Sequence, residues 1–362
     1  MTVSRRQFLR FSGAAAAVPL AACDGVDVVP DPDVPRSGFD DEATAESVTE
    51  GIDLKGKIAV VTGCNSGIGY ETMRALALRG AYVIGTGRTL EKAQAACASV
   101  RGVTSPVQLE LSDFDSVVAC AETIRSLNSP IDILVCNAGM RGGERELVDG
   151  IEKHFVVNHL GHFVLVNRLL DRLFFSWQGR IVVVASRAAY RDAPAAGIRF
   201  DDLAFADGYD VGTAYAHSKL ANVLFSLELA RLLKGTRITS NALHPGVIAT
   251  NITRELPAIV RGAFRVLTAV SGKTVEEGAA TSCYVATSPL LGSTSGAYFE
   301  DCNAVRVTGG GHMHDAAQAS ALWLRSEELT RDWLVTHERP DWSEFEQGIR
   351  GNRQRAEPAD PQ

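Results

Sequence analysis

The sequence lacks an apolar run long enough to cross a membrane. Its N-terminal apolar stretch, Phe11–Ala22, is rich in alanine and falls short of the roughly 20 residues that a membrane-spanning helix needs. Arg5 and Arg6 precede this stretch, and small residues end it. A positive start, a short apolar middle and a small-residue end are typical of an export address, so we do not expect a transmembrane anchor here.

The leader resembles two bacterial signals. The order of residues 4–10, SRRQFLR, resembles the twin-arginine export signal, a route that moves folded proteins. Residues 20–23, LAAC, resemble the lipobox of bacterial lipoproteins, in which Cys23 would be lipidated. We therefore expect residues 1–23 to be a signal peptide of a protein of the cell envelope, in the periplasm or attached to the membrane through Cys23. The alternatives are a plain cleaved signal peptide and, if the leader is not used, a cytoplasmic protein.

The sequence also lacks an excess of basic charge. The formal net charge is −7, and residues 24–50 hold most of this acidity, with nine acids against Arg36 alone. The nine acids are Asp24, Asp27, Asp31, Asp33, Asp40, Asp41, Glu42, Glu46 and Glu50. The rest of the chain is close to neutral, so no nucleic-acid surface is expected. Pro30, Pro32 and Pro35, with few large apolar residues, predict that residues 24–50 are a disordered linker.

Cysteine is present, but its placement does not suggest a disulfide framework. Of the seven cysteines, Cys64 lies in a glycine-rich stretch, Cys97 and Cys120 lie in helical patterns, and one ends an apolar run. These are typical places for free buried thiols. Cys283 and Cys302 form the one pair that we would test as a bridge. Such a protein is expected to fold in a reducing compartment.

From residue 55 the chain alternates short apolar runs with longer amphipathic segments. Near-continuous Val, Ile and Leu indicate strands that are buried on both faces. The expected strands are residues 57–63, 81–87, 104–111, 131–139, 180–186, 237–246 and 295–301. The expected helices are Tyr70–Arg79, Leu90–Val100, Phe114–Leu127, Phe155–Phe174 and Val211–Leu233.

This alternation predicts an α/β fold with a doubly wound, parallel, seven-stranded sheet, a Rossmann fold. Residues 51–335 are expected to form it as a single domain, and the charged residues 336–362 to form a C-terminal tail. A dinucleotide would then lie across the carboxyl ends of the strands.

A glycine-rich turn follows the first expected strand and opens a helix. Its glycines allow a tight turn and a close backbone approach, and the helix N-terminus offers N–H groups to a pyrophosphate. The residues expected to bind there are Gly63, Asn65, Ser66, Gly67, Ile68 and Gly69. An ordinary strand-to-helix turn is the alternative, and the motifs below argue against it.

The second expected strand ends without an acid. A site for NAD normally offers a carboxylate at this point to the ribose 2′-hydroxyl, whereas this chain has Arg88. Because a cation suits a 2′-phosphate, we expect NADP(H) to be preferred to NAD(H). A solvated arginine that opens the next helix is the alternative.

Tyr215 and Lys219 are four residues apart in an expected helix, so both side chains project from one face. A free phenol has a pKa near about 10, which a nearby ammonium lowers by favouring the phenolate. Tyr215 is therefore expected to act as acid or base, with Lys219 as its tuner. Tyrosine and lysine also meet by chance at this spacing, so the pair needs the other motifs.

Together these motifs resemble the short-chain dehydrogenase/reductase family, from about Leu54 to about Leu334. Family positions are matched by the glycine turn, by Tyr215 and Lys219, and by further residues: Asn137, Ala138, Gly139, Asn158, Ser186, Pro245, Gly246 and Thr250. The resemblance implies that Ser186 orients the substrate and that Asn158 holds a proton-relay water. It also implies that Asn137, Ala138, Gly139, Tyr215, Lys219, Pro245, Gly246 and Thr250 contact the cofactor, with Thr250 at the nicotinamide amide.

Within the family, the chain resembles the retinol-dehydrogenase-like branch in the segments FDDLAF, AYAHSKLANVLFSLELA, TVEEGAATSCYVATSPLL and SGAYFEDC. This implies an oxidoreductase that interconverts a lipophilic alcohol and a carbonyl, with hydride transfer to or from the nicotinamide and Tyr215 exchanging the proton. An exported NADP-binding protein without turnover and a photochemical tetrapyrrole reductase remain alternatives. A homo-oligomer is left open.

The chain departs from the family pattern at two points. Cys136 stands where asparagine is commoner, and Glu110-Leu111 replaces the Asp-Leu that contacts adenine. Neither change removes a proton donor. The neighbouring His154, His159 and His162 have spacings that do not place all three on one helix face, so no metal site is expected.

Overall fold

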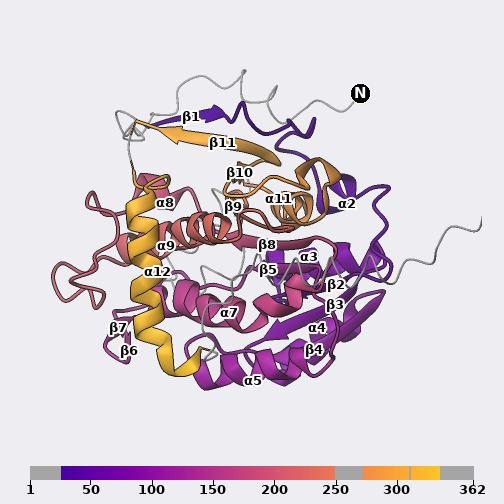
Figure 1. Cartoon of the computed structure of the whole chain (residues 1–362), viewed down its shortest axis with the longest axis horizontal. Coiled ribbons are helices and arrows are strands. Elements are labelled where there is room, and N and C mark those ends of the chain that lie inside the picture. The colour runs from indigo at the N-terminus through magenta and orange to yellow at the C-terminus, as the bar shows by residue number, and fades with distance from the viewer. Residues whose placement is uncertain (1–25, 249–271, 310, 335–362) are drawn as a thin grey trace, which may run out of the picture.

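The computed structural model describes residues 26–248, 272–309 and 311–334 (Figure 1). Several expectations fall outside this range and stay predictions: the leader with Cys23, Thr250 and the C-terminal tail. Within the described residues, no helix is both long and apolar enough to cross a membrane.

The centre of the fold is one sheet with the strand order β1-β11-β10-β9-β8-β5-β2-β3-β4. From β10 to β4 every neighbouring pair is parallel, which gives the seven parallel strands that the apolar runs predict. These strands are β2 (Ile58–Val61), β3 (Tyr82–Gly87), β4 (Val103–Gln108), β5 (Ile133–Cys136), β8 (Gly179–Val184), β9 (Ile238–His244) and β10 (Tyr298–Glu300). The doubly wound α/β fold is confirmed.

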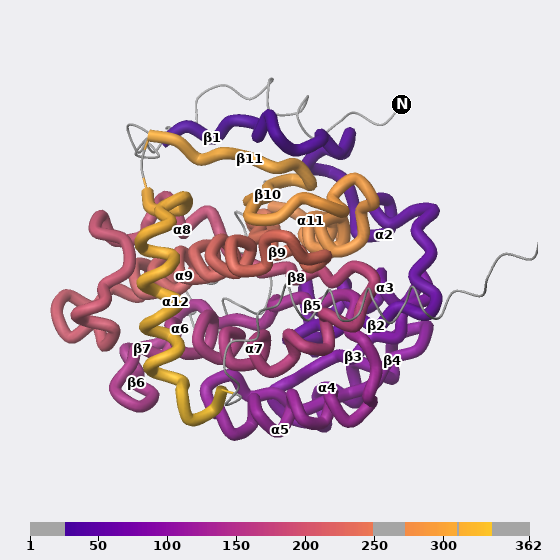
Figure 2. The backbone as a smooth tube through the Cα atoms, viewed as in Figure 1, coloured from indigo at the N-terminus to yellow at the C-terminus, as the bar shows by residue number. Residues whose placement is uncertain are grey.

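Two antiparallel strands extend the sheet beyond β10. β11 (Asn303–Thr308) pairs with β10, and β1 (Asp27–Pro30) pairs with β11. Figure 2 shows these two strands side by side along one edge of the molecule. A separate hairpin of β6 (Leu147–Val148) and β7 (Ile151–Glu152) follows β5. None of these four strands was expected from the sequence, because none contains a long apolar run.

Helices cover both faces of the sheet, and each face has its own apolar core. One core contains α5 (Phe114–Arg125), α7 (Gly161–Phe174), α9 (Val211–Leu232) and α12 (Ala316–Thr330). The other contains α2 (Ala45–Val48), α3 (Gly67–Leu78), α4 (Leu90–Ser99) and α11 (Val275–Thr287). The short helix α6 (Lys153–Phe155) directly follows β7, and α8 (Ala188–Arg191) comes shortly after the carboxyl end of β8.

The expectation that residues 24–50 form a disordered linker is wrong for its described part. β1 belongs to the sheet, and α2 packs on α11 with Ala45 and Val48 buried. Some acids of this segment form ion pairs: Arg306 pairs with Asp31 at 3.1 Å, and Arg74 with Glu46 at 2.7 Å. Few apolar residues are enough because the segment docks on a core that other elements have already formed.

The described cysteines agree with the expectation of buried thiols. Cys64, Cys97, Cys120, Cys136, Cys283 and Cys302 are all free and buried. Cys283 and Cys302, the pair considered for a bridge, are therefore not joined. Burial raises the pKa of the Cys302 thiol to about 11, so this thiol is protonated at neutral pH.

Candidate active site

The turn between β2 and α3 is shaped for a close backbone approach. Gly63 and Gly67 have φ angles of 73° and 61°, which favour glycine. A Cβ on Gly69 would lie 2.3 Å from Asn137 Nδ2 and 2.4 Å from the carbonyl oxygen of Gly63. Ser66, the N-cap of α3, makes no side-chain capping bond, so the first N–H groups of this helix are open to an anion. The residues present therefore fit a dinucleotide pyrophosphate.

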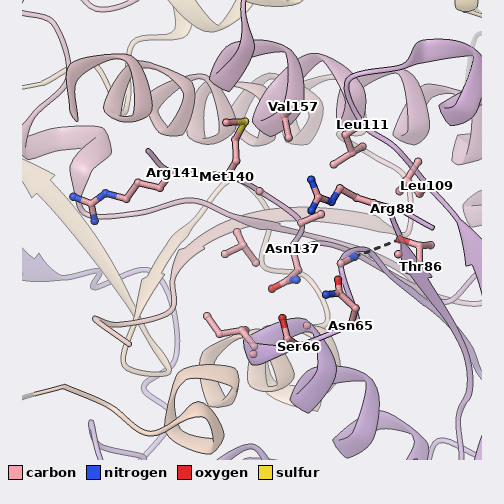
Figure 3. A pocket seen from close by; sticks show the side chains of 18 of the residues that line it. Asn65, Ser66, Thr86, Arg88, Leu109, Leu111, Asn137, Met140, Arg141 and Val157 are labelled. Carbon is pink, nitrogen blue, oxygen red and sulfur yellow. Dashed lines mark hydrogen bonds between the residues drawn. The ribbon is translucent and has the colours of Figure 1, made fainter. Parts of the chain in front are cut away.

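A pocket runs from this turn along the carboxyl ends of the parallel strands (Figure 3). Most of the residues expected from the sequence line it: Gly63, Asn65, Ser66, Gly67, Ile68, Gly69, Arg88, Asn137, Ala138, Gly139, Tyr215, Lys219 and Pro245. Gly246 follows directly, with a φ of 96° and Lys273 packed against it. The structure thus brings one group of distant sequence motifs to one edge of the sheet.

Thr62 at the end of β2 holds the neighbouring strand end in place. Its hydroxyl oxygen accepts hydrogen bonds from the backbone N–H groups of Asn137 and Ala138, both at 2.9 Å. The side-chain amide of Asn137 donates to the carbonyl oxygen of Thr62 at 2.8 Å. Gly63 N–H also donates to the Thr86 hydroxyl at 3.3 Å, drawn as a dashed line in Figure 3. Three strand ends are therefore fixed relative to one another around the pocket.

Arg88 directly follows β3 and lines the pocket with an exposed side chain (Figure 3). No acidic partner of Arg88 is found among the described residues, and this leaves its charge available to an anion. Leu109 and Leu111 give this end of the pocket an apolar wall. Glu110, which replaces the usual aspartate, accepts hydrogen bonds from the N–H and hydroxyl groups of Ser112 at 3.1 and 2.8 Å.

Tyr215 lies in the first half of α9 and is almost fully buried, with 6% of its surface exposed. Burial raises the pKa of its phenol, because the charged phenolate loses solvent. The charge of Arg141 and a hydrogen bond with Ser186 act against this and lower the pKa. Ser186 comes just after β8, so the structure joins the expected serine and tyrosine.

Lys219 lies one turn further along α9, as its spacing predicts. Its Nζ donates a hydrogen bond to the carbonyl oxygen of Val184 at 2.9 Å and lies 5.8 Å from the ring centroid of Tyr215. Burial lowers the pKa of Lys219 to about 8. The ammonium is thus close enough to act on Tyr215, and its environment already disfavours its own charge.

Asn158 lies behind the pocket wall and does not itself line the pocket. Its Oδ1 accepts from the N–H of Met140 at 2.8 Å, and its Nδ2 donates to the Met140 carbonyl at 3.1 Å and to the Ser218 hydroxyl at 2.9 Å. A Cβ on Gly139 would lie 3.0 Å from Asn158 Oδ1 and 3.6 Å from Lys219 Nζ. Asn158 therefore positions the loop between β5 and the hairpin. Its role in holding a relay water stays a prediction.

The single helix expected over Phe155–Phe174 is interrupted. A π-helical turn, η1 (Val156–Leu160), separates α6 from α7 and contains Asn158. Such turns often mark functional sites, because they change the direction of a side chain within a helix. Sequence periodicity does not reveal one inserted residue, so this feature was missed.

The three histidines of this region each have a different partner. His154 Nδ1 bonds to Glu152 at 2.7 Å, His159 Nε2 to the Ser326 hydroxyl at 2.8 Å, and His162 Nε2 to the Thr62 hydroxyl at 3.0 Å. Burial lowers the pKa of His159 to about 3 and that of His162 to about 4, so both are neutral at ordinary pH. They act as fixed hydrogen-bonding groups of the interior.

Sequence analysis missed Arg141, which belongs to the loop after β5. Its guanidinium lies 5.0 Å from the centroid of the Tyr215 ring, over its face. Figure 3 shows it at the end of the view opposite Thr86. No motif contains Arg141, and only the fold brings it to Tyr215, so no signal in the sequence could have found it.

Comparisons with known proteins identify the family of the chain. The family model described as short chain dehydrogenase matches residues 57–198. Retinol dehydrogenase 12 of Homo sapiens is 40% identical over 284 residues, which cover 77% of this chain and 87% of that protein. Short-chain dehydrogenase TIC 32 A, chloroplastic, of Brassica napus is 38% identical over 307 residues, which cover 81% and 95%.

A solved structure supports the same fold. It is the crystal structure of a putative uncharacterized protein from Mycobacterium paratuberculosis, with a TM-score of 0.62 and 31% sequence identity. The superposition covers 78% of this chain and 97% of that one.

Proposed function

This chain belongs to the short-chain dehydrogenase/reductase family of NAD(P)-dependent oxidoreductases, and from this premise we propose that it interconverts an alcohol and a carbonyl with NADP(H). One observation carries the proposal: Tyr215 and Lys219 both line the pocket that the glycine turn of α3 opens. When bound there, the nicotinamide supplies or accepts the hydride. The chain's own residues must then donate or accept the proton.

In the reducing direction, the Tyr215 hydroxyl donates its proton to the carbonyl oxygen of the substrate. Ser186 donates a hydrogen bond to the same oxygen, which stabilises the negative charge that develops on it. The Lys219 ammonium stabilises the phenolate that Tyr215 becomes. In the oxidising direction the phenolate removes the alcohol proton, and the same contacts act in reverse.

We propose a lipophilic substrate. The relatives include proteins named retinol dehydrogenases, at about 40% identity. The pocket wall contains Met140 and Val157, which suit an apolar chain. Arg141 also lines the pocket, 5.0 Å from the centroid of the Tyr215 ring, so a polar or charged group near the reacting carbonyl is also compatible with this wall.

Turnover is tested by mixing the purified full chain with NADPH and a panel of aldehydes that includes retinal, and by following the nicotinamide absorbance. We expect oxidation of NADPH with at least one long-chain aldehyde. Tight nucleotide binding without turnover across the panel would instead support a binding protein. Light-dependent reduction of a tetrapyrrole, with no aldehyde turnover, would support the photochemical alternative.

Arg88 is the basis for proposing NADP(H) over NAD(H). In the wild-type chain we expect NADPH to bind at least tenfold more tightly than NADH, because a guanidinium can pair with the 2′-phosphate. Arg88→Ala should remove this preference and leave NADH affinity nearly unchanged. Isothermal titration calorimetry with NADPH and with NADH measures the two affinities. Arg101→Ala, which removes another exposed arginine, is the matched control. Equal affinities in the wild-type chain would reject the proposal.

A further inference from the structure

Tyr215 has cations on two sides. Lys219 approaches from its own helix, with Nζ 5.8 Å from the ring centroid. Arg141 approaches from the loop after β5, with its guanidinium carbon 5.0 Å from the same centroid. The mechanism above uses Lys219 and leaves Arg141 without a role.

Arg141 is not held by a carboxylate within the part of the chain that the structure describes. Two other cations of the hairpin region have protein partners: Lys153 pairs with Glu146, and Arg145 donates to the carbonyl oxygen of Ala204 at 3.0 Å. Arg141 is half-buried and lines the pocket. An uncompensated guanidinium in this position exerts its charge on Tyr215 more strongly than a solvated one would.

We propose that Arg141 is a positioning residue for the proton transfer: from the loop after β5 it stabilises the Tyr215 phenolate electrostatically and holds the ring by a cation–π contact. Lys219 and Arg141 then both stabilise the Tyr215 phenolate, a role that the sequence spacing suggested for Lys219 alone. This inference rests on the proposed function for its catalytic consequence, but the ionisation of Tyr215 can be measured without any substrate.

Three other charged or titratable groups lie in the elements around Tyr215. The His154 ring on α6 packs edge-on at 6.4 Å between centroids, and its Nδ1 bonds to Glu152. Arg187, directly before α8, is paired with Glu300 at 2.6 Å. On β10, Tyr298 is fully buried, and burial raises its pKa. These groups stay unchanged when Arg141 is replaced, so the variant isolates one charge.

The sign of the effect follows from electrostatics. A cation favours the phenolate and lowers the pKa of Tyr215, so Arg141→Met should raise that pKa by about one unit. In the oxidising direction the rising limb of kcat/KM against pH should move to higher pH by the same amount. In the reducing direction the falling limb should also move to higher pH, because Tyr215 keeps its proton longer.

The direct test is a tyrosinate absorbance titration of the full-length protein. The absorbance of the matching Tyr215→Phe protein is subtracted at each pH, so that the difference reports the ionisation of Tyr215 alone. We expect a higher midpoint for Arg141→Met, a wild-type-like midpoint for Arg141→Lys, and no shift for Arg145→Met, the control from the same region. Circular dichroism at each pH verifies that the variants stay folded, and Arg141→Gln provides a second neutral variant.

An unchanged midpoint in both neutral variants would overturn the proposal, whatever the protein's activity. A change in KM for anionic substrates alone, without a shift in the midpoint or in the pH profile, would overturn it in favour of substrate binding. If the wild-type chain turns over no carbonyl, the proposed function fails, while the tyrosinate midpoints still decide the role of Arg141.

Discussion

Lys219 carries an ammonium group into a buried position, where it donates a hydrogen bond to the Val184 carbonyl oxygen. Burial lowers its pKa from the ordinary value of 10.5 to about 8. At neutral pH the folded protein therefore holds a charge that the unfolded chain solvates better. This placement costs stability, and it is retained where Tyr215 and the nucleotide pocket need the charge.

We predict that Lys219→Met stabilises the nucleotide-free protein at pH 7 by about 1 to 3 kcal/mol while abolishing turnover. Wild-type stability should rise as pH increases from about 8 toward 10.5, because there the folded state binds fewer protons than the unfolded state. The stability difference between Lys219→Met and the wild-type protein should therefore become smaller as the pH rises. Urea unfolding at pH 7 and pH 9.5 measures this, with exposed Lys92→Met as control. A variant that is less stable than wild type at pH 7 would contradict the prediction.

The sequence motifs identify residues whose roles depend on local spacing. Tyr215 and Lys219 are one helical turn apart, and Ser186 follows an apolar strand, so each could be placed before the structure. Arg141 could not be placed, because its role depends on where a loop without a motif lies relative to α9. Residues with a local pattern are predictable, and residues that meet only through the fold are not.

At the scale of elements, the seven parallel strands and the helices α3, α4, α5, α7 and α9 were predictable because each has an apolar run or a 3.6-residue period. The helices α11 and α12 were not among the elements expected from the sequence. The π-helical turn at Val156–Leu160 was not, since it adds one residue to a pattern that still looks helical. The segment before residue 51 was misjudged for another reason. Its composition is that of a linker, but α2 and β1 gain their stability from surfaces on α11 and β11.

The docking of α2 gives an element-scale prediction. Val48 is 5% exposed in the core shared with α11, so Val48→Ala should lower the free energy of unfolding by about 1 to 3 kcal/mol. Val28 on β1 is 39% exposed, and Val28→Ala should change the free energy of unfolding by less than about 0.5 kcal/mol. Urea unfolding of both variants and of the wild-type protein measures these changes. No loss in Val48→Ala would mean that the segment behaves as the linker its composition suggests.

At the scale of the whole molecule, the parallel sheet brings the ends of β2, β3, β5, β8 and β9 to one edge. The turn at Gly63, the cation at Arg88 and the group around Tyr215 thereby come from separate parts of the chain to one pocket. Two independent cores support the two faces of the sheet, so this edge is held from both sides. The arrangement separates the half of the pocket that we propose binds the nucleotide from the half that we propose transfers the proton.

The central claim is that Tyr215 transfers the proton while the rest of the pocket binds the nucleotide, and a single-turnover experiment with Tyr215→Phe tests it most directly. NADPH affinity and the nicotinamide absorbance after mixing with an accepted aldehyde are measured for both proteins. We predict a fall in the single-turnover rate of at least about a hundredfold, with NADPH affinity within about threefold of wild type. A Tyr215→Phe protein that oxidises NADPH at the wild-type rate would contradict the account.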